Sequence, residues 1–364
     1  MSGRWTAINA LEARGVVGSF TNQTALAPLL AGTGYTGRDG LCHTSNLNPA
    51  YFPDGFCWTP ADDVSSVWTP QGSTGSHDAQ PGGTWFGKYV YIASWHNKTN
   101  TMSRISVVDN STGGAPIYNN VLLVDPYGSG TSANFKASAG HADGITWYGN
   151  KLFLATGHVI QVYDLRHLWK LGAHTDQVGV TGSTASAAYH NYALPMIGSY
   201  SNGSGDCTAT APCPTSLSPD RNGTDSLVTS QFMLHGGGPV VRWPLNAADA
   251  LLETNGPNNY TGAVTANAAY RVPIWKVQGA ATDGTYYYFS GLCPEFADSK
   301  IENSDDPYCI HRAKPGEAPH VLTRAPRLTQ NLSWSPSAGR LWGINERLNY
   351  SDPSRMVFSI NPPN

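Results

Sequence analysis

Two segments of the chain resemble each other and carry histidines at equivalent places. They read HDAQPGGTWFGKYVYIASWH, residues 77–96, and HADGITWYGNKLFLATGH, residues 141–158. His77 and His96 flank the first segment, and His141 and His158 flank the second. A neutral imidazole accepts a proton near neutral pH, and a second group can return one to a leaving oxygen. Histidines gathered at one place would therefore provide acid–base catalysis.

The sequence between each pair of histidines predicts a β-hairpin. In both segments Thr-Trp-aromatic-Gly leads into an alternating apolar run, and the glycine marks a tight turn. An antiparallel hairpin brings its outer ends together. We therefore expect His77 to lie near His96, and His141 near His158.

Weaker hairpins recur along the chain, which is typical of a β-propeller. The visible repeats begin near residues 77, 141, 214, 275 and 330. Residues 5–70 and 186–210 have the length for one or two more blades. We expect one all-β domain over residues 1–364, with seven four-stranded antiparallel blades, or six as the alternative. The N-terminal segment is expected to add a strand to the last blade and close the ring.

Strand ends of consecutive blades meet on one face of a propeller. We therefore expect His77, His96, His141 and His158 to form one catalytic site near the central channel. Other polar residues predicted to reach this site and bind substrate are His235, Arg104, Lys276, Asn345 and Arg347. A histidine repeated in each blade can instead tie loops together, and this structural alternative stays open.

Composition excludes several classes of partner. Charged residues make up 13% of the chain, the net charge is −3, and no basic run is present, so no nucleic acid is expected. No apolar stretch is long enough to cross a membrane, so no membrane partner is expected. We expect a monomer.

Cysteines and sequons favour a secreted glycoprotein. The six cysteines fall into close pairs, predicted as Cys42 with Cys57, Cys207 with Cys213 and Cys293 with Cys309, although other connectivities remain open. Sequons occur at Asn22, Asn97, Asn110, Asn202, Asn222, Asn259, Asn331 and Asn349.

Histidine and arginine without an obvious carboxylate pair suit β-elimination on a uronic acid better than glycoside hydrolysis. Asp78 and Asp143 follow the histidines, so a hydrolase stays open. No cofactor is expected, but several imidazoles at one mouth would suit a divalent metal. A metal-dependent lactonase or oxidoreductase is therefore one rival, and a sugar-binding propeller without catalysis is another.

The stretches GSHDAQPGGTWFGKYVYIASWHN and AGHADGITWYGNKLFLATGH resemble the fungal L-rhamnose-α-1,4-D-glucuronate lyases, secreted polysaccharide lyases built as seven-bladed propellers. The resemblance implies release of terminal rhamnose from the glucuronate side chains of an acidic plant polysaccharide such as gum arabic. It implies His77 or His141 as the base at C5, and His96 or His158 as the acid. Arg104, Lys276 or Arg347 would hold the carboxylate.

Overall fold

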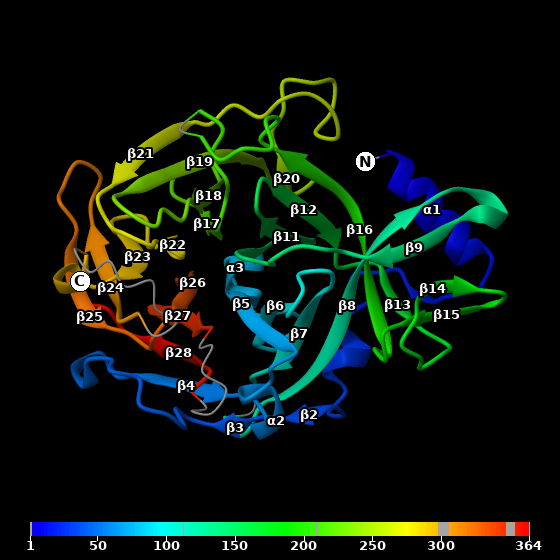
Figure 1. The fold of residues 1–364 in the computed structure, drawn as a ribbon, viewed down its shortest axis with the longest axis horizontal. Helices are drawn as coiled ribbons and strands as arrows, with labels where there is room; N and C mark the ends of the chain where they lie inside the picture. Colours follow the sequence, from blue (N-terminus) through cyan, green and yellow to red (C-terminus); the bar gives the residue numbers. More distant parts are fainter. Residues whose placement is uncertain (1, 112, 209, 298–305, 347–353, 364) are drawn as a thin grey trace.

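The chain forms a five-bladed β-propeller (Figure 1). The structure, a computed structural model, describes residues 2–111, 113–208, 210–297, 306–346 and 354–363. The inner strands β5, β10, β17, β22 and β26 contact one another in a closed ring around the axis. The predicted all-β propeller is therefore confirmed.

Each blade is an antiparallel meander that runs outward from the axis. The five blades consist of β5 (Trp68–Gly75), β6 (Val90–Asn97), β7 (Ser103–Asp109) and β8 (Ile117–Tyr127); β10 (Ile145–Tyr148), β11 (Lys151–Thr156), β12 (Val159–Asp164) and β16 (Tyr192–Ser201); β17 (Ser216–Asp220), β18 (Ser226–Ser230), β19 (Gly238–Asn246) and β21 (Ala268–Val272); β22 (Gly279–Thr282), β23 (Tyr287–Leu292), β24 (Tyr308–Ala313) and β25 (His320–Arg324); and β26 (Thr329–Ser335), β27 (Arg340–Asn345), β28 (Met356–Ile360) and β4 (Asp54–Cys57).

The remaining elements connect or flank these blades. They are the helices α1 (Ser2–Ala13), α2 (Pro60–Asp63) and α3 (Ser76–Ala79); the short strands β1 (Gly18–Phe20), β2 (Tyr35–Thr36), β3 (Arg38–Asp39), β9 (Asn134–Ala137), β13 (Leu168–Lys170), β14 (Val178–Thr181), β15 (Thr184–Ala187) and β20 (Leu251–Leu252); and 3-10 turns at Ala27–Leu30, Pro49–Tyr51, Gly130–Ser132 and Pro294–Phe296. Helix α3 contacts the inner strands β5, β10 and β26.

The expected count of seven or six blades was wrong. Residues 5–70 form most of α1, short outer strands and β4. Helix α1 packs on β8 and β16. Residues 186–210 contain the end of β15 and all of β16, the outer strand of the second blade, which also pairs in parallel with β8. The extra length therefore wraps the outside of the ring instead of forming further blades.

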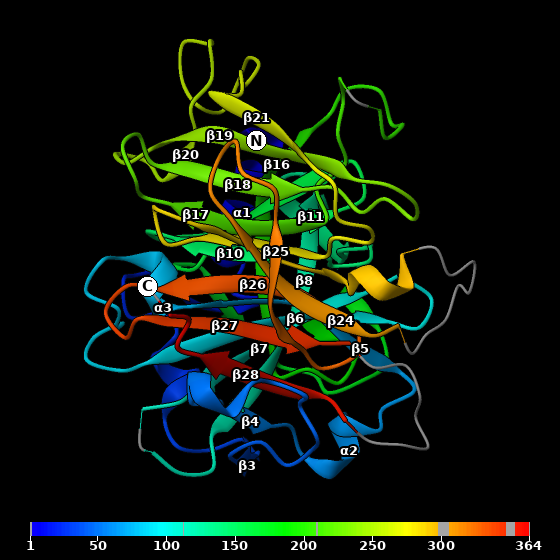
Figure 2. The ribbon, with the colours of Figure 1, turned by 90° about the vertical axis from the view of Figure 1, so that its left-hand side faces the viewer.

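The N-terminal segment closes the ring as predicted. In the side view, β26, β27, β28 and β4 follow one another as neighbouring strands (Figure 2). β4 pairs antiparallel with β28, with Cys57 opposite Met356 and Asp54 opposite Ser359. The last blade thus joins strands from both ends of the chain, so its pairing can form only when the ring is complete.

A buried amide joins the inner strands in the channel. Asn331 of β26 is fully buried, and its Nδ2 donates to the carbonyl oxygens of Ser73 at 2.8 Å, Ile145 at 3.1 Å and Leu217 at 3.0 Å. Its Oδ1 accepts from the backbone N–H of Leu217 at 2.9 Å. One side chain therefore links the fifth blade to the first three.

Glycines let the inner strands approach one another without side chains between them. A Cβ atom at Gly144 would overlap the backbone of Ser216 and Leu217. A Cβ atom at Gly279 would lie 2.5 Å from the carbonyl oxygen of Gln330. The channel of this propeller is consequently narrow, because backbone meets backbone at these two places.

The three predicted disulfides form, linking Cys42 to Cys57, Cys207 to Cys213 and Cys293 to Cys309. The sequons fit glycosylation less well. Asn97, Asn259 and Asn331 are buried, and each amide nitrogen donates hydrogen bonds inside the fold. These three asparagines therefore cannot carry a glycan in the folded protein, and Asn349 lies outside the described residues.

Replacing Asn331 with Ala should destabilise the fold severely. The variant leaves three buried carbonyls and one N–H without their partner, and each such group costs about 1–3 kcal/mol. Urea unfolding should show a loss of several kcal/mol, whereas exposed Asn22→Ala should change little. Equal stabilities of the two variants would contradict the role assigned to Asn331.

Candidate active site at the mouth of the channel

Two of the four predicted catalytic histidines meet at one end of the channel. His96 lies near the end of β6 in the first blade, and His141 precedes β10 in the second. Their rings stack with centroids 4.2 Å apart and planes at 24°. His96 is buried, while the His141 side chain is 42% exposed. We call this end of the channel the mouth.

His77 lies at the opposite end of the channel, so its predicted place was wrong. In the β5–β6 pair, Thr69 faces His96 and Gly75 faces Tyr91, which puts the residues after Gly75 far from the mouth. The inner strand precedes His77 in sequence instead of following it.

The environment of His77 is structural. Nδ1 of the buried ring lies 2.7 Å from the Tyr89 hydroxyl, and Nε2 bonds the Ser333 hydroxyl. Ser333 also donates to Asp78 at 2.7 Å. Burial lowers the pKa of His77, opposed by the charge of Asp78. His77 and Asp78 therefore tie the first blade to the last.

His158 lies on the mouth side but outside the channel. The open end of the β10–β11 hairpin is formed as predicted, since the His141 N–H donates to Thr156 Oγ1 at 3.1 Å. The His158 side chain, in the turn between β11 and β12, lines a separate pocket with Tyr200 and Trp243. It therefore does not join the histidine pair.

Two of the three predicted substrate-binding cations, Arg104 and Lys276, are already paired within the protein. Arg104 lies between the rings of Trp68 and Trp95 and donates to Asp62 at 2.9 Å. Lys276 is buried, with its Nζ 2.6 Å from a carboxylate oxygen of Asp306. Each of these two cations is therefore already neutralised by a carboxylate of the protein.

Two of the other three predicted binding residues, Asn345 and His235, have partners away from the histidine pair. Asn345 is buried and holds β28 by accepting from the Met356 N–H at 2.8 Å. His235 is exposed in the loop after β18 and contacts the edge of Trp275. Arg347 lies outside the described residues.

Three residues that sequence reasoning missed, Glu346, Gln330 and Gln71, lie at the mouth. Glu346 is buried directly after β27, and one donor atom each of Glu346, His96 and His141 lie within 4.8 Å of one another. Gln330 donates to Glu346 Oε2 at 2.8 Å, and Gln71 Nε2 lies 3.4 Å from His96 Nε2. The sequence analysis predicted Asn345 and Arg347 at this strand end and passed over Glu346, which lies between them in the sequence.

His96 presents an unprotonated nitrogen to the mouth. Its Nδ1 lies 2.8 Å from the carbonyl oxygen of Asn97, which only accepts, so Nδ1 carries the hydrogen. Burial, followed by the charge of His141, lowers the pKa of His96 to about 4. At neutral pH Nε2, which faces the Gln71 amide at 3.4 Å, therefore carries a lone pair that can accept a proton.

His141 has the opposite tendency. Burial lowers the pKa of His141, but the hydrogen bond and charge of Asp143, whose Oδ1 lies 2.9 Å from Nδ1, outweigh burial and raise it overall. Two stacked imidazoles thus have pKa values displaced in opposite directions. Such a separation is how one site holds both a base and an acid.

The carboxyl group of Glu346 is also perturbed. Burial raises the pKa of Glu346, while the charge of His141, a hydrogen bond from Gln71 and the charge of Arg355 oppose the shift. Oε1 of Gln71 is buried and lacks a hydrogen-bond partner among the described residues. An unpartnered buried oxygen beside the histidines is suited to meeting a donor on a ligand.

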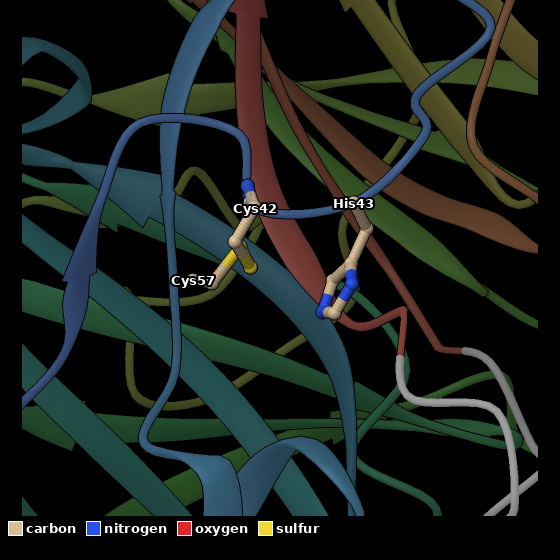
Figure 3. A group of neighbouring side chains, drawn as sticks. All are labelled: Cys42, His43 and Cys57. Carbon is tan, nitrogen blue, oxygen red and sulfur yellow. Dashed lines mark hydrogen bonds between the residues drawn. A yellow bond between two sulfur atoms is a disulfide. The ribbon is translucent and has the colours of Figure 1, made fainter.

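Two clusters have the residue types of a metal site, and neither fits one as arranged. A metal ion lies in the plane of each imidazole that binds it, so the stacked rings of His96 and His141 would have to rotate before sharing an ion. The second cluster is Cys42, His43 and Cys57, where the disulfide removes both thiolates (Figure 3).

No protein-family model and no curated protein matches the sequence. Among solved structures, Myxococcus xanthus glutaminyl cyclase is similar at 10% identity over 82% of this chain and 94% of that chain, with a TM-score of 0.39. A gluconolactonase from Xanthomonas campestris is similar at 12% identity over 90% and 97%, with a TM-score of 0.35. The PQQ-bound aldose sugar dehydrogenase from Streptomyces coelicolor is similar at 12% identity over 74% and 75%, with a TM-score of 0.32. Similarities this low say nothing about the chemistry of this chain.

The burial of neutral His77 predicts a fold that weakens in acid. Its pKa is lowered in the fold, so below the unfolded value of roughly 6.5 the unfolded chain binds a proton that the folded chain refuses. The free energy of unfolding should fall with pH below that value, by up to about 1.4 kcal/mol per pH unit for this residue. Urea titrations should show a shallower fall for His77→Gln than for the exposed His235→Gln. Identical slopes would contradict the assignment.

Proposed function

We propose that the protein is a carbohydrate-active enzyme that cleaves a uronate-containing glycan by β-elimination at the mouth. The observation that carries this proposal is the stacked pair of His96 and His141, whose Nδ1 atoms have different partners, a carbonyl and a carboxylate. One imidazole of the pair is thereby prepared to accept a proton and the other to donate one.

The proposed reaction uses each ring once. His96 Nε2 takes the proton from C5 of the uronate, the C5–H electrons form the C4–C5 double bond, and the C4–O bond breaks. His141 Nε2–H gives its proton to the departing oxygen, so atoms and charge balance without water. These roles reverse those that the resemblance implied for His96 and His141.

The carboxylate of the substrate needs a partner that withdraws its charge, because this acidifies the C5–H. Arg104 and Lys276 are held by Asp62 and Asp306 and do not supply it. We assign this role to Glu346, whose pKa burial raises and so shifts toward the neutral carboxyl form. A neutral carboxylic acid is a hydrogen-bond donor to an oxyanion.

The proposed substrate is the rhamnosyl-glucuronate side chain of an acidic plant polysaccharide such as gum arabic, as the sequence resemblance implies. Secretion to an extracellular site is part of this proposal. Three disulfides support it, since such bonds persist in oxidising compartments. No helix among the described residues is long and apolar enough to cross a membrane.

Incubation with gum arabic and other uronate polysaccharides should raise the ultraviolet absorbance of a conjugated, unsaturated uronate. His96→Ala and His141→Ala should each lower the rate by about 10²–10⁴-fold, as for lost acid–base catalysis. His235→Ala, on an exposed loop, is the matched control and should keep full activity. Sugar release without an absorbance change would refute elimination in favour of hydrolysis.

Activity should survive a chelator, because the stacked rings are expected to transfer protons and not to bind an ion. The measurement is the same absorbance assay after dialysis against EDTA. Loss of activity that a divalent ion restores would contradict the proposal and favour a metal-dependent enzyme.

The rate should follow a bell-shaped pH profile. It should fall on the acid side as His96, with its pKa lowered to about 4, becomes protonated. It should fall on the alkaline side as His141 loses its proton, above the ordinary histidine value of roughly 6.5. Asp143→Asn removes the charge that raises the His141 pKa, so its alkaline limb should move to lower pH. A kcat/KM profile with an unmoved alkaline limb would contradict these roles.

A further inference from the structure

A second pocket opens between the second and third blades. It encloses about 600 Å³ and is lined by strands β12 and β16 on one side and β18 and β19 on the other, with loops above them. This volume is within the range of small-molecule sites in proteins, about 300–1,000 Å³. Twenty of the described residues line the pocket, and none of these twenty is Asp, Glu, Lys or Arg.

The walls combine aromatic rings with uncharged polar groups. Tyr200, Trp243 and Tyr260 supply the rings. Two of the rings are fixed in place, because Trp243 Nε1 donates to Thr229 Oγ1 at 3.0 Å and the Tyr200 hydroxyl donates to the Asn259 carbonyl at 3.3 Å. The hydroxyls of Thr254 and Thr261 and the amide of Asn202 also lie along the lining.

A disulfide-bonded loop forms one wall. The Cys207–Cys213 bond closes a loop whose residues Ala211 and Pro212 line the pocket. Asn202 Nδ2 donates to the carbonyl oxygens of Asp206 at 2.9 Å and Ala211 at 3.0 Å, which holds the loop from inside. This wall is therefore preformed, and a ligand would not have to order it on binding.

The pocket adjoins the proposed active site. Asp143, the partner of His141, accepts from the Gly157 N–H at 3.4 Å. The next residue, His158, lines the pocket. Gly157 thus contacts the partner of His141 and directly precedes a residue of the pocket lining.

We propose that this pocket binds neutral sugar residues of the same glycan whose acidic residue reacts at the mouth. The apolar face of a sugar ring packs on an aromatic side chain, while its hydroxyls bond to neutral donors and acceptors. A carboxylate would meet no lysine or arginine among the described residues of this pocket, so an acidic residue is disfavoured there. The link to the reacting residue rests on the proposed function, whereas binding of a neutral sugar does not.

Calorimetric titration with neutral galacto-oligosaccharides tests the pocket without any catalysis. The wild-type protein should bind, and Tyr260→Ala should bind at least tenfold more weakly. Tyr260 is 43% exposed, so its loss should leave the melting temperature unchanged. The matched control is Tyr127→Ala, an equally exposed tyrosine on β8 at 49%, which should bind as the wild type does. Absence of binding, or equal weakening by both variants, would overturn the proposal.

Kinetics separates this proposal from the proposed function. With a long uronate polysaccharide, Tyr260→Ala should raise KM at least tenfold with kcat unchanged, and with a short rhamnosyl-glucuronate it should change neither. Elimination with an unchanged KM would overturn the pocket assignment alone. Oligosaccharide binding by a protein without lyase activity would keep the neutral site and overturn the proposed function alone.

Discussion

The geometry of the mouth depends on the hydrogen bonds of one buried amide. Asn331 joins the inner strand of the last blade to those of the first three, and its polar atoms are matched by backbone groups. Gly144 lets the second and third inner strands touch at the backbone. The channel is filled at this level, which separates the His77 end from the mouth. The close packing of the inner strands also brings the first and second blades near enough for His96 and His141 to stack.

The stacking of His96 on His141 depends on the tertiary fold, whereas the different partners of their Nδ1 atoms come from neighbouring residues in the sequence. Stacking unites side chains from neighbouring blades, and it requires the completed ring. The asymmetry is encoded locally: His96 bonds the carbonyl of the next residue, whereas His141 bonds the carboxylate two residues further on. Opposite displacements of pKa therefore arise in rings that are chemically identical and almost parallel. Burial of the neighbouring Glu346 adds a third perturbed group at the same point.

The sequence predicted those features that depend on local turns. The predicted turns at Gly149-Asn150 and Asp283-Gly284 each connect two paired antiparallel strands. Each turn contains a glycine with a positive φ, which allows the chain to reverse its direction. The Trp-aromatic-Gly pattern forms the turn between β10 and β11 in the second segment, but in the first it forms a tight turn, with Trp85 paired to Lys88, inside the loop between β5 and β6. The strand expected between His77 and this turn is therefore absent, and the prediction placed His77 at the wrong end of the blade. Glu346 and the number of blades depend on register and ring closure, which local patterns do not contain.

The central claim is that the two stacked imidazoles at the mouth have pKa values displaced in opposite directions. Nuclear magnetic resonance titration of ¹⁵N-labelled histidines, assigned with His96→Gln and His141→Gln, measures this directly. The account predicts that His96 titrates near pH 4, with its neutral form protonated on Nδ1. It predicts that His141 titrates above the ordinary histidine value of roughly 6.5. Titration of both rings at one ordinary value would contradict the account.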